Sequence, residues 1–309
     1  MLNQINGLHH VTSIASGANE NNAFFTRVLG LRRVKKTVNF DAPDVYHLYY
    51  GDAAGSPGSV MTYFPFPHAR RGRPGAGEVS QTAFAVPLGA TGWWAERLAT
   101  FGVENIEKQT RFGETRLRFN GPDGDGFSLV EVDDPRAPWL SQGVDDDHAI
   151  RGFHSAEMRL NDPSATAELL QFMGYQQLGQ DDDITRFIRD GGNGAHLIDL
   201  ETLPDAPQSN QGAGSVHHIA FSVDNRATQE QVRKALLDTG YQVTPVIDRD
   251  YFWAIYFRTP AGVLFEIATN EPGFDRDEPA GHLGESLMLP DRHAHLRPQL
   301  EQLLEPITD

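Results

Sequence analysis

The sequence predicts an α+β fold in which four β-α-β-β-β modules pair into two domains, each a cupped mixed sheet. The main observation is that one order of short apolar runs and a helix-like segment recurs four times, beginning near residues 8, 80, 152 and 215. In addition, residues 120–124 and 258–262 are similar glycine-containing turns that each lead into an apolar strand. Because one such module buries only one face of its sheet, the modules are expected to pair.

The first module shows this order most clearly. Residues 8–15 are rich in β-branched side chains and predict a strand. Residues 21–30 predict a short helix, because apolar side chains recur on one face and Gly30 ends the pattern. Three extended segments follow, at residues 33–39, 45–50 and 59–64. Residues 70–77 are too rich in Gly and Pro for a regular element and are expected to form a loop.

The same order is expected three more times along the chain. Helices are predicted at residues 92–101, 164–173 and 229–239, and each is followed by a glycine. The strands that accompany them are predicted from about residues 81–86, 107–111, 115–120, 127–132, 151–154, 175–178, 185–189, 195–200, 215–221, 242–248, 253–259 and 263–268.

This organisation predicts where the domains begin and end. An N-terminal domain at residues 1–135 and a C-terminal domain at residues 149–275 would each hold two modules. The polar residues 133–148 are interpreted as a linker between them. Residues 276–309 are expected to be a polar tail that ends in a helix around residues 297–304.

The composition excludes several classes of partner. The chain of 309 residues has a formal charge of −16, which argues against binding to nucleic acid or to an anionic membrane surface. It has no cysteine, so a metal would have to bind histidine, carboxylate or water. No secretory signal and no apolar run near the ~20 residues of a membrane span are found, so a cytoplasmic protein is expected. A homo-oligomer is left open.

Histidine pairs occupy equivalent positions in the first strands of two modules. They are His9 and His10 in the first module and His217 and His218 in the fourth. The other two modules have Gln81 and Ser155 at the second position of the pair. Neighbouring side chains on a strand point to opposite faces, so only one histidine of each pair can face a common ion. The residues alone do not say which one.

A carboxylate completes the pattern. Glu266 lies between Phe265 and Ile267 in the last strand of the fourth module, and burying it is costly unless it is paired or coordinated. With one histidine from each pair it would form a two-histidine, one-carboxylate metal site. Taken singly, Glu266 could be a surface residue at a strand end, and His47 and His154 are interpreted as structural groups. The joint occurrence favours the metal site. It also requires the first and fourth modules to lie side by side.

These motifs resemble those of the vicinal oxygen chelate superfamily, which includes glyoxalases and extradiol dioxygenases. More closely, the chain resembles the hydroquinone ring-cleaving dioxygenases. The resemblance covers nearly the whole chain and rests on residues 8–10, 46–50, 70–77, 151–155, 216–218 and 258–266. Catechol-cleaving relatives hold both histidines in their C-terminal domain, an arrangement that Ser155 rules out here.

The resemblance implies roles for particular residues. His10, His218 and Glu266 would bind Fe(II), with Mn(II) or another divalent metal as the alternative. His9 and His217 would support the ligands from behind. Arg249 and Tyr256 match the family's active-site arginine and tyrosine. Without the resemblance, they would be interpreted as a surface arginine and a core tyrosine.

The activity implied is the opening of a hydroquinone-type ring, substituted or chlorinated in some cases, by O₂. The metal would lower the pKa of a bound phenol, Arg249 and Tyr256 would hold the phenolate, and His9 or His217 would move the proton. The partners would be an aromatic diol and O₂. One alternative is a glyoxalase-like isomerase or lyase, although such sites usually take four protein ligands. Another is a small-molecule binding or resistance protein without turnover.

Overall fold

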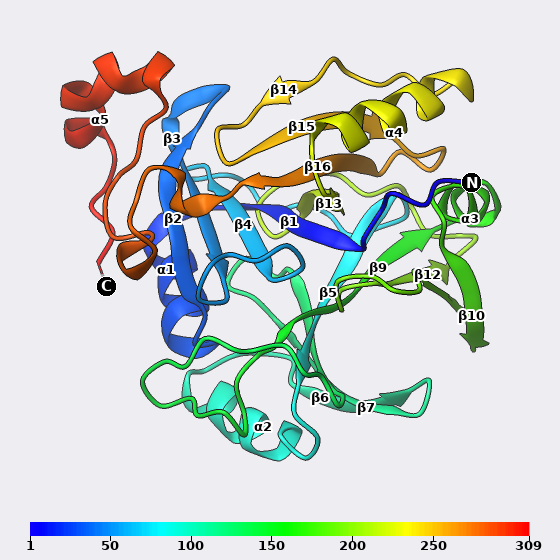
Figure 1. Ribbon diagram of the computed structural model, residues 1–309. Coiled ribbons are helices and arrows are strands. Elements are labelled where there is room, and N and C mark those ends of the chain that lie inside the picture. The colour runs from blue at the N-terminus through cyan, green and yellow to red at the C-terminus, as the bar shows by residue number, and fades with distance from the viewer. Residues whose placement is uncertain (309) are drawn as a thin grey trace.

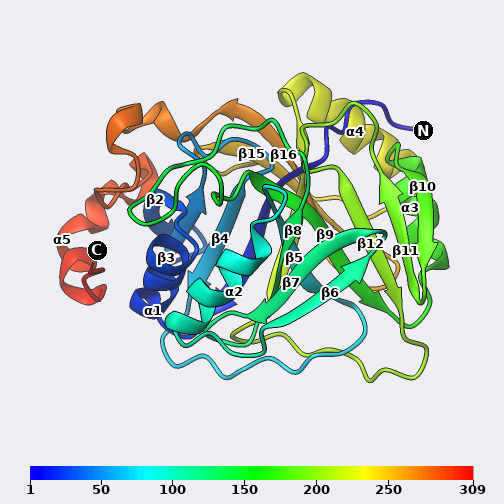
Figure 2. The same cartoon turned by 90° about the horizontal axis from the view of Figure 1, so that it is seen from below.

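The computed structural model describes residues 1–308 and contains two curled eight-stranded sheets (Figures 1 and 2). The strands of the first sheet are, in order, β14 (Ile247–Asp248), β15 (Phe252–Arg258), β16 (Leu264–Pro272), β13 (Val216–Val223), β1 (Leu8–Ala15), β4 (Val60–Pro65), β3 (Ala42–Gly51) and β2 (Arg32–Asn39). Those of the second are β10 (Gln176–Asp181), β11 (Ile184–Ile188), β12 (Leu197–Thr202), β9 (Gly152–Leu160), β5 (Glu78–Val86), β8 (Gly126–Glu131), β7 (Glu114–Asn120) and β6 (Glu107–Arg111).

Each sheet joins two modules through their first strands. Strand β1 runs antiparallel to β13, and β5 runs antiparallel to β9. The first module therefore pairs with the fourth and the second with the third, which confirms that the first and fourth lie side by side. The sheets do not follow the ranges 1–135 and 149–275 that the sequence suggests as domains, because each sheet takes one module from each range. The first strands of all four modules are similar apolar runs, so nothing local to them selects the partner.

The helices form where the sequence predicts them. They are α1 (Ala18–Ala23), which continues into the π-helical turn Phe24–Val28, α2 (Thr91–Thr100), α3 (Ser164–Phe172) and α4 (Arg226–Asp238). Their apolar faces are buried, as Trp94 and Leu98 of α2 show. Along β13, Ile219 and Phe221 are fully buried and lie on the opposite strand face from His218. Each sheet thus has an apolar face and an inner, partly polar one.

One predicted strand is much shorter than expected. The sequence suggests a strand at residues 242–248, but only Ile247–Asp248 pairs with β15. Nearer its start, the Oγ1 atom of Thr244 accepts a hydrogen bond of 3.0 Å from the backbone nitrogen of Tyr256. This side chain satisfies a donor that a regular ladder would otherwise pair with a main-chain carbonyl.

The tail after β16 packs back onto the first sheet. It contains the 3₁₀ turns η2 (Phe274–Arg276), η3 (Ala280–His282) and η4 (Asp291–Leu296), and the predicted terminal helix forms as α5 (Arg297–Leu303). Figure 1 shows it, in orange and red, beside β2 and β3. The fully buried Lys35 of β2 lies 2.6 Å from Asp277 and 2.5 Å from Glu278. The tail is thus joined to the sheet by buried charge. No helix within residues 1–308 is both long and apolar enough to cross a membrane.

Candidate metal centre

Three adjacent strands bring the predicted ligands together. Ala220 of β13 pairs with His10 of β1 on one side and with Glu266 of β16 on the other. His218 stands two residues before Ala220 and therefore on the same face. Because Ala220 has only a methyl group, the imidazole and the carboxylate can approach one another across it. The convergence follows directly from the strand register.

The ligand atoms form a small triangle. The Nε2 atom of His218 lies 2.9 Å from Oε2 of Glu266, that of His10 lies 3.4 Å from the same oxygen, and the two Nε2 atoms are 3.2 Å apart. Ligands about 2.1 Å from an ion and at right angles to each other would be about 3 Å apart. The triangle therefore has the dimensions of three ligands on one face of an octahedral ion.

The carboxylate supports the same interpretation. Glu266 is completely buried, and within residues 1–308 neither of its oxygens has a hydrogen-bond donor of acceptable geometry. Burial opposes its ionisation, but His10 and His218 hold the pKa of the carboxyl well below its ordinary value. A buried anion that faces two imidazole nitrogens lacks a cation, and a divalent metal ion would supply it. The residues present therefore fit such an ion.

Hydrogen bonds behind His10 set which of its nitrogens faces the centre. Burial, followed by His10, lowers the pKa of His9 to about 3, so the His9 ring is neutral. Its Nε2 lies 3.1 Å from the carbonyl oxygen of Thr269, which can only accept, so Nε2 carries the proton. The Nδ1 atom of His9 must then accept from Nδ1 of His10, 3.0 Å away. With Nδ1 engaged in this way, Nε2 is the nitrogen of His10 that faces the centre and could bind an ion there together with Glu266.

The fourth module repeats this arrangement with one difference. The Nδ1 atoms of His217 and His218 are 2.8 Å apart, and burial, followed by His218, lowers the pKa of His217 to about 4. For His218 to bind an ion through Nε2, its Nδ1 must donate to His217, which then carries its own proton on Nε2. Among the described residues, that Nε2 has no partner like Thr269. His217 instead lines the cavity beside the centre.

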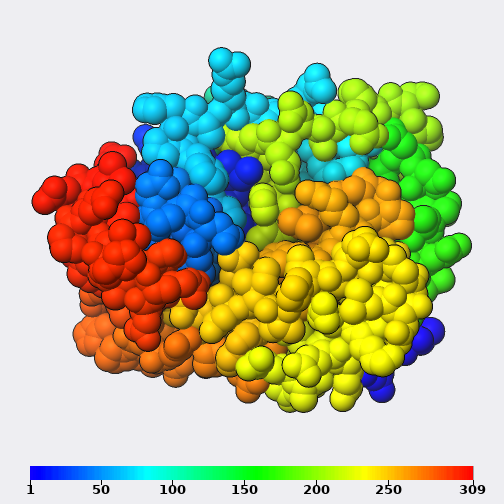
Figure 3. Space-filling view, turned by 90° about the horizontal axis from the view of Figure 1, so that it is seen from above, coloured from blue at the N-terminus to red at the C-terminus, as the bar shows by residue number. Residues whose placement is uncertain are grey.

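A cavity of about 340 Å³ adjoins the three ligands. Its other lining side chains are mostly aromatic. They include Phe40, Tyr49, Phe64, Phe66, Phe252 and Tyr256. Figure 3 shows a hollow on this side of the molecule, bordered by blue, orange and yellow segments from the first and fourth modules and by a yellow-green segment that precedes the fourth. An aromatic enclosure with a few converging polar groups is typical of a site for a small aromatic ligand.

Arg249 and Tyr256 lie together at this cavity, as the resemblance suggests. Tyr256 of β15 is the strand partner of Glu266, and its ring packs edge-on to that of His218 at 5.8 Å. Nε of Arg249 donates to the Tyr256 hydroxyl at 3.2 Å, and Nη1 donates to Asp41 at 3.0 Å. Burial, followed by Glu266, raises the pKa of Tyr256 well above its ordinary value. Tyr256 therefore keeps its proton.

Sequence reasoning missed part of the cavity wall. His47, interpreted above as a structural group, lines the cavity with Tyr49. Both nitrogens of His47 are engaged, with Nδ1 2.8 Å from the Tyr49 hydroxyl and Nε2 2.7 Å from Oγ1 of Thr62. Phe252 packs against both His9 and His10. Because side chains alternate between the two faces of a strand, the sequence could have placed His47 and Tyr49 on one face of β3. No sequence signal showed that this face lines the same cavity as β15. His154 fits its structural interpretation, since it binds Glu114 and Ser155 outside the cavity.

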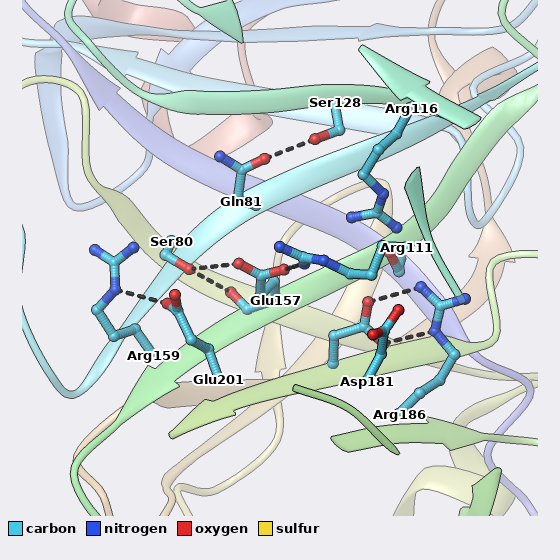
Figure 4. Close-up of polar contacts among 12 residues, drawn as sticks. Ser80, Gln81, Arg111, Arg116, Ser128, Glu157, Arg159, Asp181, Arg186 and Glu201 are labelled. Atoms are coloured by element: carbon cyan, nitrogen blue, oxygen red, sulfur yellow. Dashed lines mark hydrogen bonds and ion pairs between the residues drawn. The ribbon is translucent and has the colours of Figure 1, made fainter. Parts of the chain in front are cut away.

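The second sheet has the same register but different residues at the corresponding positions. Gln81 pairs with Glu157 as His10 pairs with Ala220, and Glu157 pairs with Asp199 as Ala220 pairs with Glu266. The partner of Asp199 is Arg186, which donates to its two oxygens at 2.8 and 2.9 Å. Figure 4 shows Arg186 among the other ion pairs of this face. A guanidinium thus neutralises the carboxylate that corresponds to Glu266.

Comparisons with known proteins agree with this architecture. The family model described as "Glyoxalase/Bleomycin resistance protein/Dioxygenase superfamily" matches residues 151–267. The chain is 43% identical to a Bacillus subtilis protein named "Putative ring-cleaving dioxygenase MhqO", over 97% of this chain and 96% of that protein. It is 36% identical to a Sphingobium indicum protein named "Chlorohydroquinone/hydroquinone 1,2-dioxygenase", over 99% of this chain and 97% of that one.

Solved structures give the same picture. A crystal structure described as a "putative dioxygenase from Bacillus subtilis" is 42% identical, covers 99% of both chains and superposes with a TM-score of 0.96. Glyoxalase I from Zea mays, at 14% identity, 85% coverage of this chain and 92% of that one, has a TM-score of 0.63 and shares the fold alone. The similarity to MhqO over nearly the whole of both chains shows the family. The chain belongs to the glyoxalase/bleomycin resistance protein/dioxygenase superfamily and, within it, to the family that contains these ring-cleaving dioxygenases.

Proposed function

We propose that this protein is a non-haem Fe(II) dioxygenase that opens a hydroquinone-type aromatic ring with O₂. The observation that carries the proposal is the buried triangle of His10, His218 and Glu266 at the wall of an aromatic cavity. The names of its relatives, one of them a chlorohydroquinone/hydroquinone 1,2-dioxygenase, support this substrate class. Three protein ligands on one face leave room for substrate and O₂, as in other two-histidine, one-carboxylate sites.

When bound, iron would lower the pKa of the substrate phenol and allow charge to pass from the ring to O₂. The protein's part is to bind and orient the ring. A cavity of about 340 Å³ accommodates a single substituted ring, and Phe40, Phe64 and Phe252 supply apolar contact on its sides. These walls also keep bulk water away from the reacting atoms, which strengthens every polar contact inside.

Arg249 and Tyr256 supply the polar contacts for the substrate oxygen. The Tyr256 hydroxyl accepts from Arg249 and retains its own proton, which we propose it donates to a substrate oxygen. Because its pKa is raised by burial and by Glu266, it remains a donor at neutral pH. Arg249 is half-buried, and burial would lower its pKa, but contacts with Tyr256 and Asp41 raise it and keep the group charged. Together they would hold a phenolate and the negative charge that develops on oxygen.

Of the two supporting histidines, His217 is the better placed to contact substrate. His217 lines the cavity, whereas the Nε2 proton of His9 is held by the Thr269 carbonyl. We therefore assign His217 the hydrogen bond to a substrate or product oxygen, and His9 the orientation of His10.

The diol and O₂ together account for every atom of a ring-opened product that carries a carboxylate and an aldehyde, so no further reductant is needed.

An oxygen electrode and metal analysis test the proposal together. Protein reconstituted with Fe(II) should consume O₂ with hydroquinone or chlorohydroquinone, and metal-stripped protein should not. His10→Ala and His218→Ala should lose bound iron, whereas His154→Ala, a buried histidine outside the centre, should keep it. Full iron content in both ligand variants would refute the ligand assignment. Turnover that needs metal but consumes no O₂ would favour the isomerase class instead.

A further inference from the structure

The mouth of the cavity is formed by two turns from different modules. One, at residues 39–42 between β2 and β3, provides Phe40 and Asp41; the other, at residues 248–252 between β14 and β15, provides Arg249. The Arg249–Asp41 ion pair crosses from one turn to the other. Neither turn is a strand, so the position of Arg249 depends on whatever holds the two turns in place.

One residue of the tail contacts both turns. Arg292 lies in η4, and its guanidinium carbon is 4.7 Å from the centre of the Phe40 ring. Its Nη2 atom is 3.5 Å from Oδ2 of Asp250, which directly follows Arg249. Arg292 is absent from the lining of the cavity itself. Figure 3 shows the red tail next to the blue segment that borders the hollow.

The Asp250 turn has features that call for such support. Its backbone φ of +64° lies in the left-handed region, which is uncommon for a residue other than glycine. Its Oδ2 atom is buried without a hydrogen bond among the described residues and faces Arg292, while Nη1 of Arg276 lies 3.3 Å from its Oδ1. From η2, Arg276 donates to the Asp250 carbonyl at 2.7 Å. Two arginines of the tail therefore hold this turn from outside.

The Phe40 turn is held from the same short segment. His293, the neighbour of Arg292, donates from Nε2 to the Phe40 carbonyl at 3.1 Å. Phe40 is thus fixed through its ring by Arg292 and through its backbone by His293. Phe40 as a whole is only 9% exposed, because the cavity is on one side of its ring and the tail on the other. A shift of η4 would move Phe40, and the ion pair of Asp41 with Arg249 would move with it.

We propose that Arg292 is a positioning residue that fixes Arg249 across the mouth of the cavity by tying the Phe40 turn to the Asp250 turn. It sets the affinity for an aromatic diol without touching the substrate or the metal ligands. The inference rests on the proposed function where it concerns the diol, and on the contacts alone where it concerns the two turns. The effect is expected to be geometric, because the Arg292 side chain is 42% exposed and its charge is well screened.

The test compares Arg292→Gln with Arg297→Gln in iron-loaded protein. The Arg297 side chain is equally exposed on the same tail, but it pairs with Glu301 of its own helix. Arg292→Gln should raise KM for the diol roughly five- to tenfold, equivalent to about 1 kcal/mol of binding, with kcat and iron content unchanged. Arg292→Lys, which keeps the charge, should fall in between, and Arg297→Gln should match the parent protein.

Amide hydrogen exchange gives a second readout that needs no activity. Arg292→Gln should speed exchange in residues 38–42 and 248–252 and leave β1, β13 and β16 unchanged. Unchanged KM with unchanged exchange in both turns would overturn the proposal, and so would a fall in iron content equal to the loss of activity. If the parent protein neither binds nor converts any diol, the proposed function fails, and the exchange data alone then decide whether Arg292 ties the two turns.

Discussion

Proton placement is as important at the centre as the identity of the ligands. The Thr269 carbonyl can only accept, and this one contact orders the protons along His9 and His10 so that Nε2 of His10 is the nitrogen left for an ion. A ligand histidine that is free to rotate, or that carries its proton on Nε2, must first be reoriented or lose that proton. Either step costs free energy and weakens ion binding. On the proposed assignment, His9 would therefore contribute to metal affinity without reaching the ion.

Replacing His9 tests this contribution. His9→Phe keeps a ring of similar size in the core but leaves Nδ1 of His10 without its acceptor. Affinity for Fe(II) should fall about 10- to 100-fold, as is usual for a residue that orients a metal ligand. A chelator competition titration would measure the change, with circular dichroism to confirm the fold. Unchanged affinity would show that His10 does not depend on His9 for its orientation.

The Tyr256 hydroxyl can be tested without disturbing the packing. Tyr256→Phe retains the ring that packs against His218 and removes only the donor. The value of kcat for a hydroquinone should fall about 10²-fold, the loss typical of one donor to a developing oxyanion, with iron content unchanged. Steady-state oxygen uptake measures it. A variant with full activity would place the substrate oxygen away from Tyr256.

At the scale of the strand, the centre depends on the small side chain of Ala220, which leaves space between the neighbouring side chains. Ala220 is completely buried between His10 and Glu266, and its methyl group leaves the space that the two side chains occupy. The second sheet shows the contrast, because Glu157 stands at the corresponding position and fills the face with an ion pair to Arg111. A small residue at this point of β13 is therefore a requirement of the site rather than of the sheet.

Filling the gap should separate metal binding from folding. Ala220→Leu adds three carbons to a packed interior and should lower the free energy of unfolding by about 1–3 kcal/mol. Because the added carbons lie between His10 and Glu266, iron binding should be lost even where the protein stays folded. Urea unfolding and metal analysis of the same sample check both effects. A folded variant with full iron content would contradict the role given to Ala220.

The sequence predicted where the helices and strands lie better than it predicted which strands pair with one another. Helices α2, α3 and α4 lie within a few residues of the prediction, because apolar spacing and a terminal glycine are local signals. The strand at 242–248 is mostly absent. The backbone nitrogen of Thr244 still donates to the Tyr256 carbonyl, but the Tyr256 nitrogen donates to the Thr244 side chain rather than to a main-chain carbonyl. The two histidine pairs and Glu266 stand out in the sequence because polar residues are unusual in apolar strands, and the family resemblance selected His10 and His218 from the pairs. His47, Tyr49 and Phe252 were missed because they are ordinary residues whose function depends on which module faces which.

For the whole molecule, the two sheets share a register but not a chemistry. The corresponding position in the second sheet holds a carboxylate, Asp199, but Arg186 already pairs with both of its oxygens. Gln81 and Ser155 stand at the positions of His10 and His218. Of the two sheets, the first has the two imidazoles and a carboxylate that, within residues 1–308, no arginine or lysine pairs with, so the chain is expected to hold one ion.

The number of ions can be counted directly. Titration of the metal-free protein with Fe(II) under anaerobic conditions should saturate at about one ion per chain, because the second sheet offers no imidazole at either counterpart position. Asp199→Asn should leave this value unchanged, whereas Glu266→Gln should abolish tight binding. Saturation at two ions, with one lost in Asp199→Asn, would show that the second sheet also binds metal.

The pairing of β1 with β13 also affects how the chain is made. His10 and His218 are separated by 208 residues, so on a ribosome that adds about 5–20 residues per second the first ligand waits about 10–40 s for the second. During that interval β5 and β9 can already pair, while β1 has an open edge on the side that β13 will fill. The metal site can assemble only after the fourth module has emerged. If the protein holds the proposed metal ion, bound metal would therefore mark a chain that has been synthesised through β16.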